Sequence, residues 1–509
     1  MKVRLGCTAV GFLLLAFSLA AQTSGNSPGS AQMSPLIQSS SVAEDEGGKA
    51  LLDTVLYNFS GSPRDGAESY STPVYDLYGN LYGTTAFGGT GNCFNNAGCG
   101  TVFVLCAPNV PGNKDVLPCS AGNPAWQEHV LYSFAGGKDG AVPKSSLLFM
   151  GAGSRKPLTL YGTTYYGGQS NCNDGTGTGC GTVFELCAPS SSGGCGRGNA
   201  WRERVVHNFT GAPGKKNDGA YPHAAVITDG LGNLYGTTVY GGGKGTCSIS
   251  GTNNFCGTVF MLKGGPPWQF PEKIFHGFTG AIAGCTPYMP VPAGCDGANP
   301  YAALCCTPTK DRRGFLYLYG TAVVGGDPNQ QVGTVFEVKT SAPFTEEEIY
   351  NFGANPDGAN PYAGVIFGNS NRNTNNLYGN TVAGGKYNEG IAFELRPAVP
   401  LPYVETVLYN FCPSPNCVDG ANPVAGFIWY GDNLLGTTFQ GGEGNGTVFE
   451  LSPPVWHDLV LYNFVGAPND GVNPWAGVMF DLHVSEQREL YGTTLTGGLN
   501  NLGIVYSVP

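Results

Sequence analysis

Seven aspartates, each followed by a glycine, are the most regular residues in the chain that could do chemistry. They are Asp65, Asp139, Asp218, Asp296, Asp357, Asp419 and Asp470. Clustered carboxylate oxygens suit Ca²⁺, so seven of them on one face would form an acidic or calcium-binding rim. The same dipeptide also makes turns, because aspartate hydrogen-bonds its own backbone and glycine supplies positive φ. We favour the turn, since no copy has the dense alternating acidic residues of a calcium loop. Apart from calcium at this rim, we expect no metal or cofactor.

Two tryptophans are candidates for stacking on a ligand ring. Trp429 and Trp475 lie next to the segments that we expect to face inward in the last two sequence units. A tryptophan offers a large apolar ring with one hydrogen-bond donor, which suits a sugar face, although burial in a core uses the same properties. Four further tryptophans share one position ahead of the expected outer strand, and we interpret them as packing residues. They are Trp126, Trp201, Trp268 and Trp456.

Evidence for catalysis in the sequence is weak. One strand position repeats a glutamate in four units, at Glu185, Glu337, Glu394 and Glu450. A glycosidase needs two carboxyl groups about 5 to 10 Å apart, and repetition at one position favours a structural role instead. The six histidines share no motif spacing, and neither a serine-nucleophile elbow nor a metalloprotease helix occurs. We therefore find no catalytic motif and favour a protein that is not an enzyme.

The cysteines indicate a disulfide framework, because all but Cys7 lie in the expected mature chain. Equivalent positions in the repeat pair Cys93 with Cys99, Cys106 with Cys119, Cys172 with Cys180, Cys187 with Cys195, Cys247 with Cys256, Cys285 with Cys295 and Cys412 with Cys417. Each bond would close an insertion or a long turn. Cys305 and Cys306 are adjacent, and they form either a vicinal disulfide or two thiols that are free or crosslinked.

The elements that position these residues belong to one repeated unit. Tyr-Gly-Thr-Thr or a close variant occurs seven times, beginning at Tyr82, Tyr161, Tyr235, Tyr319, Tyr378, Leu435 and Tyr491. The later copies are about 57 residues apart and the earlier ones carry insertions. Each unit has four short runs rich in β-branched and aromatic residues, as in 363–367, 376–381, 390–395 and 407–411. Four strands per unit fit a propeller blade better than a solenoid coil. We predict an all-β, seven-bladed β-propeller over residues 51–509, closed by an N-terminal strand at 55–59 that completes the last blade.

The consensus sequence of the unit resembles the Gloeobacter/Verrucomicrobia repeat, known as the GloVer repeat. The segments that carry the likeness are 408–411, 419–423, 434–438, 441–442 and 446–451. The resemblance covers 51–509 and implies an exported bacterial protein, with no catalytic residues to carry over. Gly-Asn-Leu-Tyr is also similar to the second strand of NHL and YWTD propeller blades, which places the Ala-Gly-Val run innermost and the Leu-Tyr-Asn-Phe run outermost.

The first 20 residues indicate export. Lys2 and Arg4 precede an apolar run, and small residues follow at Ala20 and Ala21, which is the pattern of a secretory signal peptide. Residues 21–50 are rich in Ser and Gly and have no periodicity, so we expect a flexible leader. The formal net charge is -11, which disfavours nucleic acid and anionic membranes as partners. The apolar run is too short to span a membrane. We expect a monomer that is secreted, extracellular or periplasmic.

These observations favour a secreted, non-catalytic binding scaffold whose ligand is a polysaccharide or a protein. The expected binding face is the one that carries the Asp-Gly turns and the disulfide-bonded loops. Two other classes stay open. A carbohydrate-active hydrolase or lyase would fit the fold by analogy alone, and a structural surface or adhesion protein would fit the evenly repeated sequence.

Overall fold

The computed structural model describes residues 54–109, 118–119, 122–150, 158–168, 172, 178–189, 200–211, 218–242, 247–249, 252–254, 256–265, 270–280, 296–306, 316–327, 330–341, 344–353, 355–369, 371, 374–398, 402–480 and 489–509. The chain divides into two compact units, 1–41 and 42–509, and every described residue belongs to the second. The expected signal peptide and leader lie outside the described residues.

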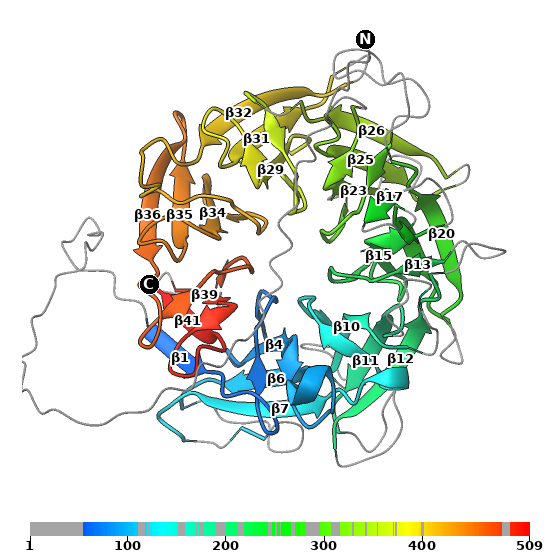
Figure 1. The fold of residues 1–509 in the computed structure, drawn as a ribbon, viewed down its shortest axis with the longest axis vertical. Coiled ribbons are helices and arrows are strands. Elements are labelled where there is room, and N and C mark those ends of the chain that lie inside the picture. The colour runs from blue at the N-terminus through cyan, green and yellow to red at the C-terminus, as the bar shows by residue number, and fades with distance from the viewer. Residues whose placement is uncertain are drawn as a thin grey trace, which may run out of the picture. The chain divides into compact units, whose positions relative to one another are not determined.

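Seven antiparallel sheets, six of four strands and one of five, form a ring around a central channel (Figure 1). From the channel outward, blade 1 is β3 (Val74–Tyr75), β4 (Leu81–Thr85), β6 (Thr101–Cys106) and β7 (Gln127–Ser133). Blade 2 is β8 (Ala141–Pro143) with β9 (Leu148–Met150), β10 (Thr159–Tyr166), β11 (Thr182–Cys187) and β12 (Arg202–Asn208). Blade 3 is β14 (Ile227–Thr228), β15 (Leu234–Thr238), β19 (Thr258–Leu262) and β20 (Glu272–Gly277). Blade 4 is β22 (Cys305–Cys306), β23 (Tyr317–Ala322), β25 (Thr334–Lys339) and β26 (Glu346–Asn351).

The remaining blades have the same order. Blade 5 is β28 (Ile366–Phe367), β29 (Leu377–Thr381), β31 (Ile391–Arg396) and β32 (Val404–Asn410). Blade 6 is β33 (Ile428–Tyr430), β34 (Asn433–Thr438), β35 (Thr447–Ser452) and β36 (His457–Asn463). Blade 7 is β38 (Met479–Phe480), β39 (Leu490–Thr493), β41 (Ile504–Val508) and β1 (Thr54–Asn58).

Short two-stranded ribbons join the Asp-Gly turns to the residues that follow the second strand of a blade. They are β2 (Gly66–Ala67) with β5 (Phe87–Gly88), β13 (Gly219–Ala220) with β16 (Tyr240–Gly241), β21 (Gly297–Ala298) with β24 (Val324–Gly325), β27 (Gly358–Ala359) with β30 (Ala383–Gly384), and β37 (Gly471–Val472) with β40 (Thr496–Gly497). A separate hairpin pairs β17 (Cys247–Ile249) with β18 (Thr252–Asn254).

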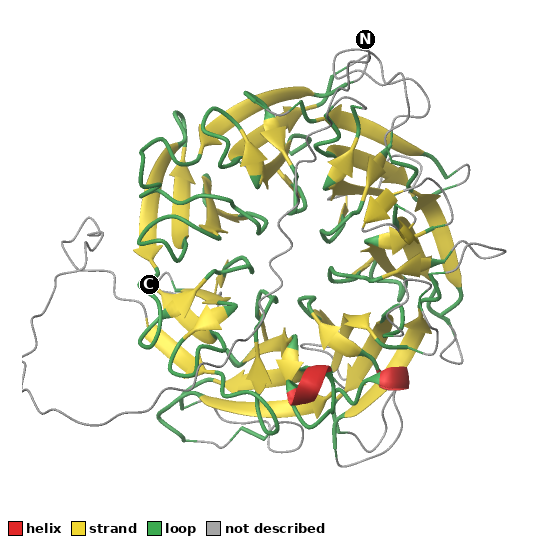
Figure 2. Cartoon of the chain, in the orientation of Figure 1, coloured by secondary structure: helices red, strands yellow, loops and turns green. Residues whose placement is uncertain are grey.

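The prediction of an all-β, seven-bladed propeller is confirmed. Figure 2 shows strands in every blade, and the helical residues of the described chain are two short 3₁₀ turns, η1 (Phe94–Asn96) and η2 (Gly137–Asp139). The outermost strands carry the Leu-Tyr-Asn-Phe run, as expected. Within the described part of the chain, no helix has the length and apolarity that crossing a membrane requires.

The two ends of the described chain close the ring. Strand β1 pairs antiparallel with β41, with Thr54 opposite Ser507 and Asn58 opposite Ile504. Blade 7 is also bonded to blade 1, because the hydroxyl of Thr493 donates to the carbonyl of Ser71 at 2.9 Å. The predicted completion of the last blade by the N-terminal strand is therefore confirmed. Closure also covers the edge of β41, where another chain could otherwise pair.

A repeated aromatic contact holds each pair of neighbouring blades together. The phenylalanine after an outermost strand meets, edge to face, the aromatic ring in the third strand of the next blade. The contacts are Phe59–Phe103, Phe134–Phe184, Phe209–Phe260, Phe278–Phe336, Phe352–Phe393, Phe411–Phe449 and Phe464–Tyr506, with centroids 5.0 to 5.3 Å apart. All of these rings are buried. Edge-to-face geometry at this spacing adds to the stabilisation from burial.

Glycine in the Tyr-Gly-Thr-Thr strand makes room for this contact. A Cβ atom on Gly83 would lie 2.6 Å from Cζ of Phe103, which is fully buried and cannot move aside. The glycine of this motif is therefore required by packing in the blade.

Four predicted disulfides are present among the described residues: Cys93–Cys99, Cys106–Cys119, Cys172–Cys180 and Cys412–Cys417. Cys187 and Cys256 are also disulfide-bonded, but their predicted partners Cys195 and Cys247 have no described side chain. The predicted bond between Cys285 and Cys295 lies outside the described residues. Cys305 lies on β22, half-buried, and the side chain of Cys306 is not described.

Candidate functional site

One position of the repeat varies between blades, and its side chains meet in the central channel. It is the fifth residue after each Asp-Gly aspartate: Tyr70, Lys144, His223, Tyr301, Tyr362, Val424 and Trp475. All seven line a single cavity of 360 Å³. Small residues, mostly alanine and glycine, follow this position in each blade and form the rest of the cavity wall. The channel is therefore shaped chiefly by these seven side chains.

The first threonine of Tyr-Gly-Thr-Thr fixes the backbone next to this position. The hydroxyl of Thr84 in blade 1 donates to the carbonyl of Ser145, the residue after Lys144, at 2.9 Å. The same bond from one blade to the next is made by Thr163, Thr237, Thr321, Thr437 and Thr493, and by the amide of Asn380. The hydroxyl ladder of this motif is thus a framework that holds the channel-lining side chains in place.

Aromatic rings from different blades touch one another across the channel. Trp475 meets Tyr70 edge-on at 5.6 Å and Tyr362 at 6.2 Å between centroids. Tyr301 meets His223 and Tyr362, both at 5.2 Å. Each of these five side chains is half-buried, so part of each ring faces the cavity. This arrangement offers several ring edges and faces to a ligand in the cavity.

Lys144 is the one lysine or arginine among the residues that line this cavity. Its ammonium group lies 4.5 Å from the centroid of Tyr70 and 5.0 Å from that of Tyr165, which are cation–π distances. Burial lowers the pKa of Lys144 to about 8, and the carboxylate of Glu68 acts in the opposite direction. Burial, followed by the charge of Lys144, lowers the pKa of His223 to about 3. His223 is therefore a neutral imidazole at pH 7.

Blades 1 to 3, which surround Lys144, also depart from the repeat at a second position, two residues before the channel-lining one. Blades 4 to 7 place an asparagine with positive φ there, and its amide bonds to a carbonyl of the preceding blade. Blades 1 to 3 place Glu68, Val142 and Tyr221 in the same conformation, with φ between 56° and 58°. A β-branched residue such as Val142 rarely adopts this φ. Tyr221 stacks on Tyr165 with centroids 5.1 Å apart, which extends the aromatic wall.

The seven Asp-Gly aspartates lie between blades, and none of them lines the channel cavity. Asp65 shows the arrangement: one carboxylate oxygen accepts from the hydroxyl of Tyr57 at 2.9 Å and from the backbone N–H of Ser60. Tyrosine makes the same contact with Asp139, Asp357, Asp419 and Asp470. Histidine takes its place beside Asp218 and Asp296. Each aspartate thus fastens the end of an outermost strand, and calcium at these residues stays a prediction.

A second acid, from the outermost strand of the next blade, lies near most of these aspartates. Described pairs are Asp65 with Glu128, Asp139 with Glu203, Asp218 with Glu272, Asp296 with Glu346, Asp357 with Glu405 and Asp419 with Asp458. Burial, and then the nearby aspartate, raises the pKa to about 8 for Glu128, Glu203, Glu405 and Asp458. These interfaces therefore hold a proton at neutral pH.

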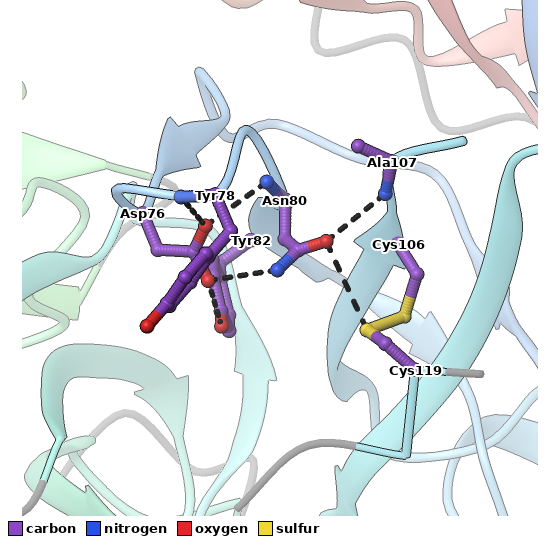
Figure 3. Close-up of a disulfide and its surroundings, with 7 residues drawn as sticks. All are labelled: Asp76, Tyr78, Asn80, Tyr82, Cys106, Ala107 and Cys119. Carbon is purple, nitrogen blue, oxygen red and sulfur yellow. Dashed lines mark hydrogen bonds between the residues drawn. A yellow bond between two sulfur atoms is a disulfide. The ribbon is translucent and has the colours of Figure 1, made fainter. Parts of the chain in front are cut away.

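The repeated glutamates have a structural contact. The hydroxyl of Tyr161 donates to Glu185 at 2.6 Å, and that of Tyr378 donates to Glu394 at 2.6 Å. In blade 1 valine replaces the glutamate, and Asp76 supplies the carboxylate instead, accepting from Tyr82 and Asn80 (Figure 3). In the same close-up the side-chain amide oxygen of Asn80, Oδ1, accepts from the backbone N–H of Ala107, next to the Cys106–Cys119 bond.

The two candidate tryptophans lie in different places. Trp475 lines the channel cavity. Trp429 donates from Nε1 to the carbonyl of Phe367 at 2.7 Å and packs against Tyr378 of blade 5, so it belongs to a blade interface. Sequence reasoning did not select Tyr70, Lys144, Tyr301, Tyr362 or Val424. The signal that could have found them is the change of residue type at one position of an otherwise regular repeat.

No family model and no curated protein matches the chain. Solved structures with a similar fold include a Trypanosoma rangeli sialidase mutant, with 9% identity and a TM-score of 0.37, where the match covers 90% of this chain and 58% of that one. Another is TolB from Acinetobacter baumannii, with 8% identity and a TM-score of 0.29, covering 65% of this chain and 59% of that one. The chain thus spans less than two thirds of these structures. Likenesses this distant carry no argument about function.

Proposed function

We propose that this protein is an exported, non-catalytic binding propeller whose central channel holds a small saccharide, such as the end of a polysaccharide chain. The observation that carries the proposal is the contrast between two kinds of position. Framework residues recur from blade to blade, whereas the seven positions that line the channel differ. Positions that depart from the repeat and line one cavity are those expected to serve a ligand.

The chemistry of the cavity supports a sugar. Aromatic rings at Tyr70, Tyr301, Tyr362 and Trp475 offer apolar faces with hydroxyl or indole donors, which match the C–H faces and hydroxyl groups of a pyranose. Lys144 adds three donors for ring hydroxyls or a carboxylate. A volume of 360 Å³ suits one or two sugar rings.

The same cavity favours binding over hydrolysis. A glycosidase requires a pair of carboxyl groups at the bond that it cleaves. The described residues that line the cavity include neither aspartate nor glutamate. The disulfides and the signal-peptide pattern of the first 20 residues support export. The consensus sequence of the repeat supports membership of the GloVer family.

Binding can be tested with oxidised protein, residues 22–509, titrated by calorimetry against neutral and acidic mono- and oligosaccharides, with released reducing sugar assayed in parallel. We expect heat of binding for a sugar and no sugar release. Tyr362→Ala should weaken binding by about tenfold, which is about 1.4 kcal/mol.

Tyr387→Ala is the matched control, because Tyr387 is exposed and does not line the channel cavity. Its affinity should equal that of the wild type. Equal losses in both variants would contradict binding in the channel. Release of reducing sugar would contradict a non-catalytic protein. Absence of binding heat with every saccharide titrated would contradict a saccharide ligand.

A further inference from the structure

A histidine and two acids converge between blades 2 and 3, away from the central channel. His207 lies on β12, Asp218 lies in the connection that follows, and Glu272 begins β20. His207 Nε2 is 3.6 Å from Asp218 Oδ1 and 3.5 Å from Glu272 Oε1. One donor atom from each residue lies within 4.8 Å of the other two. Imidazole and carboxylate are borderline-to-hard ligands that divalent transition-metal ions accept together.

These distances suit metal ligands better than hydrogen bonds. An N–H···O bond spans about 2.7 to 3.2 Å, whereas ligand atoms about 2.1 Å from a tetrahedral ion lie about 3.4 Å apart. Neither His207 Nε2 nor Asp218 Oδ1 has a hydrogen-bond partner among the residues that the structure describes, and both atoms are buried. Two polar atoms buried in this way are costly unless something binds them.

The surroundings orient Asp218 and His207. The other oxygen of Asp218 accepts from the N–H and the hydroxyl of Thr210, both at 2.8 Å, which turns Oδ1 toward His207. Asp218 is only 2% exposed. The ring of Phe209 contacts the imidazole edge-on at 4.7 Å. Second contacts of this kind fix ligand geometry before an ion binds.

The other blades provide an internal comparison. At the position of His207 five of the seven outermost strands carry a tyrosine whose hydroxyl bonds to the aspartate. His276, in the remaining strand, lies 3.1 and 3.2 Å from the two oxygens of Asp296, so it reproduces the tyrosine's hydrogen bond. Only at His207 are both carboxylate contacts too long for a hydrogen bond among the described copies. The histidine there does something that tyrosine does not do elsewhere.

We propose that His207, Asp218 and Glu272 bind one divalent transition-metal ion of the zinc class. The three residues line a cavity of 750 Å³ together with Thr210 and His276, so the fourth coordination position faces open space that water or an anionic ligand can enter. Because the ligands come from two blades and their connection, the ion crosslinks blades 2 and 3. This site is separate from the saccharide cavity and does not depend on it.

The test is calorimetric titration of untagged, oxidised, chelator-treated protein with Zn²⁺ and, in parallel, with Ca²⁺, together with thermal melts. We expect one zinc ion per chain, a higher Tm with zinc, and no comparable effect of calcium, which requires six to eight oxygen ligands. His207→Tyr should weaken zinc binding at least a hundredfold. It should still fold, because it restores the residue that five blades already carry.

His457→Tyr is the matched control, because His457 is an exposed histidine at the start of β36 and does not line this cavity; it should keep the zinc affinity of the wild type. Asp218→Asn should also lose zinc binding, and it keeps an oxygen for Thr210 in case His207→Tyr proves unstable. Absence of zinc binding in the wild type overturns the proposal. So does wild-type affinity in His207→Tyr, or an equal loss in His457→Tyr, because neither result is compatible with these three ligands.

Discussion

Replacing Glu128, Glu203 and Glu405 together by glutamine should stabilise the propeller at pH 9 and change its stability little at pH 4. Each of these acids lies between two blades beside an Asp-Gly aspartate, and burial followed by that aspartate raises its pKa to about 8. One carboxyl oxygen of each is buried without a hydrogen-bond partner among the described residues. A glutamine amide has the shape of the protonated acid and cannot ionise.

The sign follows from proton linkage. Below the ordinary pKa of 4.5 these acids are protonated in both the folded and the unfolded chain, so they cost nothing. Between pH 4.5 and about 8 the folded chain holds the extra protons, and its free energy of unfolding falls as the pH rises. Above about pH 8 the whole cost is present and constant. The variant removes this cost and therefore gains stability only on the alkaline side.

The size of the gain follows from the difference between the two pKa values. Without relaxation it corresponds to about 5 kcal/mol per carboxylate. The side chains are half-buried, and water access and small movements reduce this to about 1 to 2 kcal/mol each. The three interfaces are distant and should add to about 3 to 6 kcal/mol. For a propeller of this length the unfolding entropy is about 1 kcal/mol per kelvin, so Tm should rise by about 3 to 6 °C.

The assay is thermal unfolding followed by circular dichroism at pH 4 and pH 9, at a single ionic strength. The control is Glu443→Gln, because Glu443 is exposed and its replacement should leave both Tm values unchanged. A rise of equal size at pH 4 and pH 9, or a fall at pH 9, would refute the assignment of protonated acids to the blade interfaces.

Three further predictions concern the packing, the channel and the closure. Gly83→Ala should lower stability by about 1 to 3 kcal/mol, measured by guanidinium unfolding, because its Cβ would overlap the ring of Phe103; an unchanged midpoint would refute the packing argument. Lys144→Met should raise the pKa of His223, measured by NMR titration, because the lysine charge helps to lower it; an unchanged pKa would show that the two groups are not coupled. Truncation that removes β1 should expose the edge of β41 and yield aggregates in gel filtration, and a stable monomer would contradict closure by this strand.

The fold could be predicted from the sequence because every blade repeats the same signals. The runs at 376–381, 390–395 and 407–411 correspond to β29, β31 and β32, each within three residues at its ends. The run at 363–367 contributes only β28 (Ile366–Phe367) to the sheet. Its first part forms the channel wall instead, where the Thr321 hydroxyl holds the carbonyl of Ala363. Periodicity cannot distinguish a strand end from such a bend.

Most of the channel site could not be predicted from the sequence, because repeats indicate residues that recur, whereas the channel-lining residues differ from blade to blade. Trp475 was selected for its type, whereas Tyr362 and Lys144 have meaning only once a ring of blades brings one position to a common axis. The contact of His207 with Glu272 is equally invisible in the sequence, because the two residues belong to different blades. The sequence also does not show the direction of a side chain. The Asp-Gly aspartates point toward the preceding outermost strand rather than the channel.

Pairing of β1 with β41 also sets an order of events. Strand β1 precedes all other described strands in the chain, yet its partner β41 is the last of them. During synthesis or export, β1 must therefore wait until almost the whole chain has emerged before it can pair. Six blades can form from neighbouring segments, while the seventh depends on a contact across more than 440 residues, such as that between Leu499 and Asn58. Ring closure is thus expected to be the slow step of folding, and a chain stalled before β41 would retain an unpaired first strand.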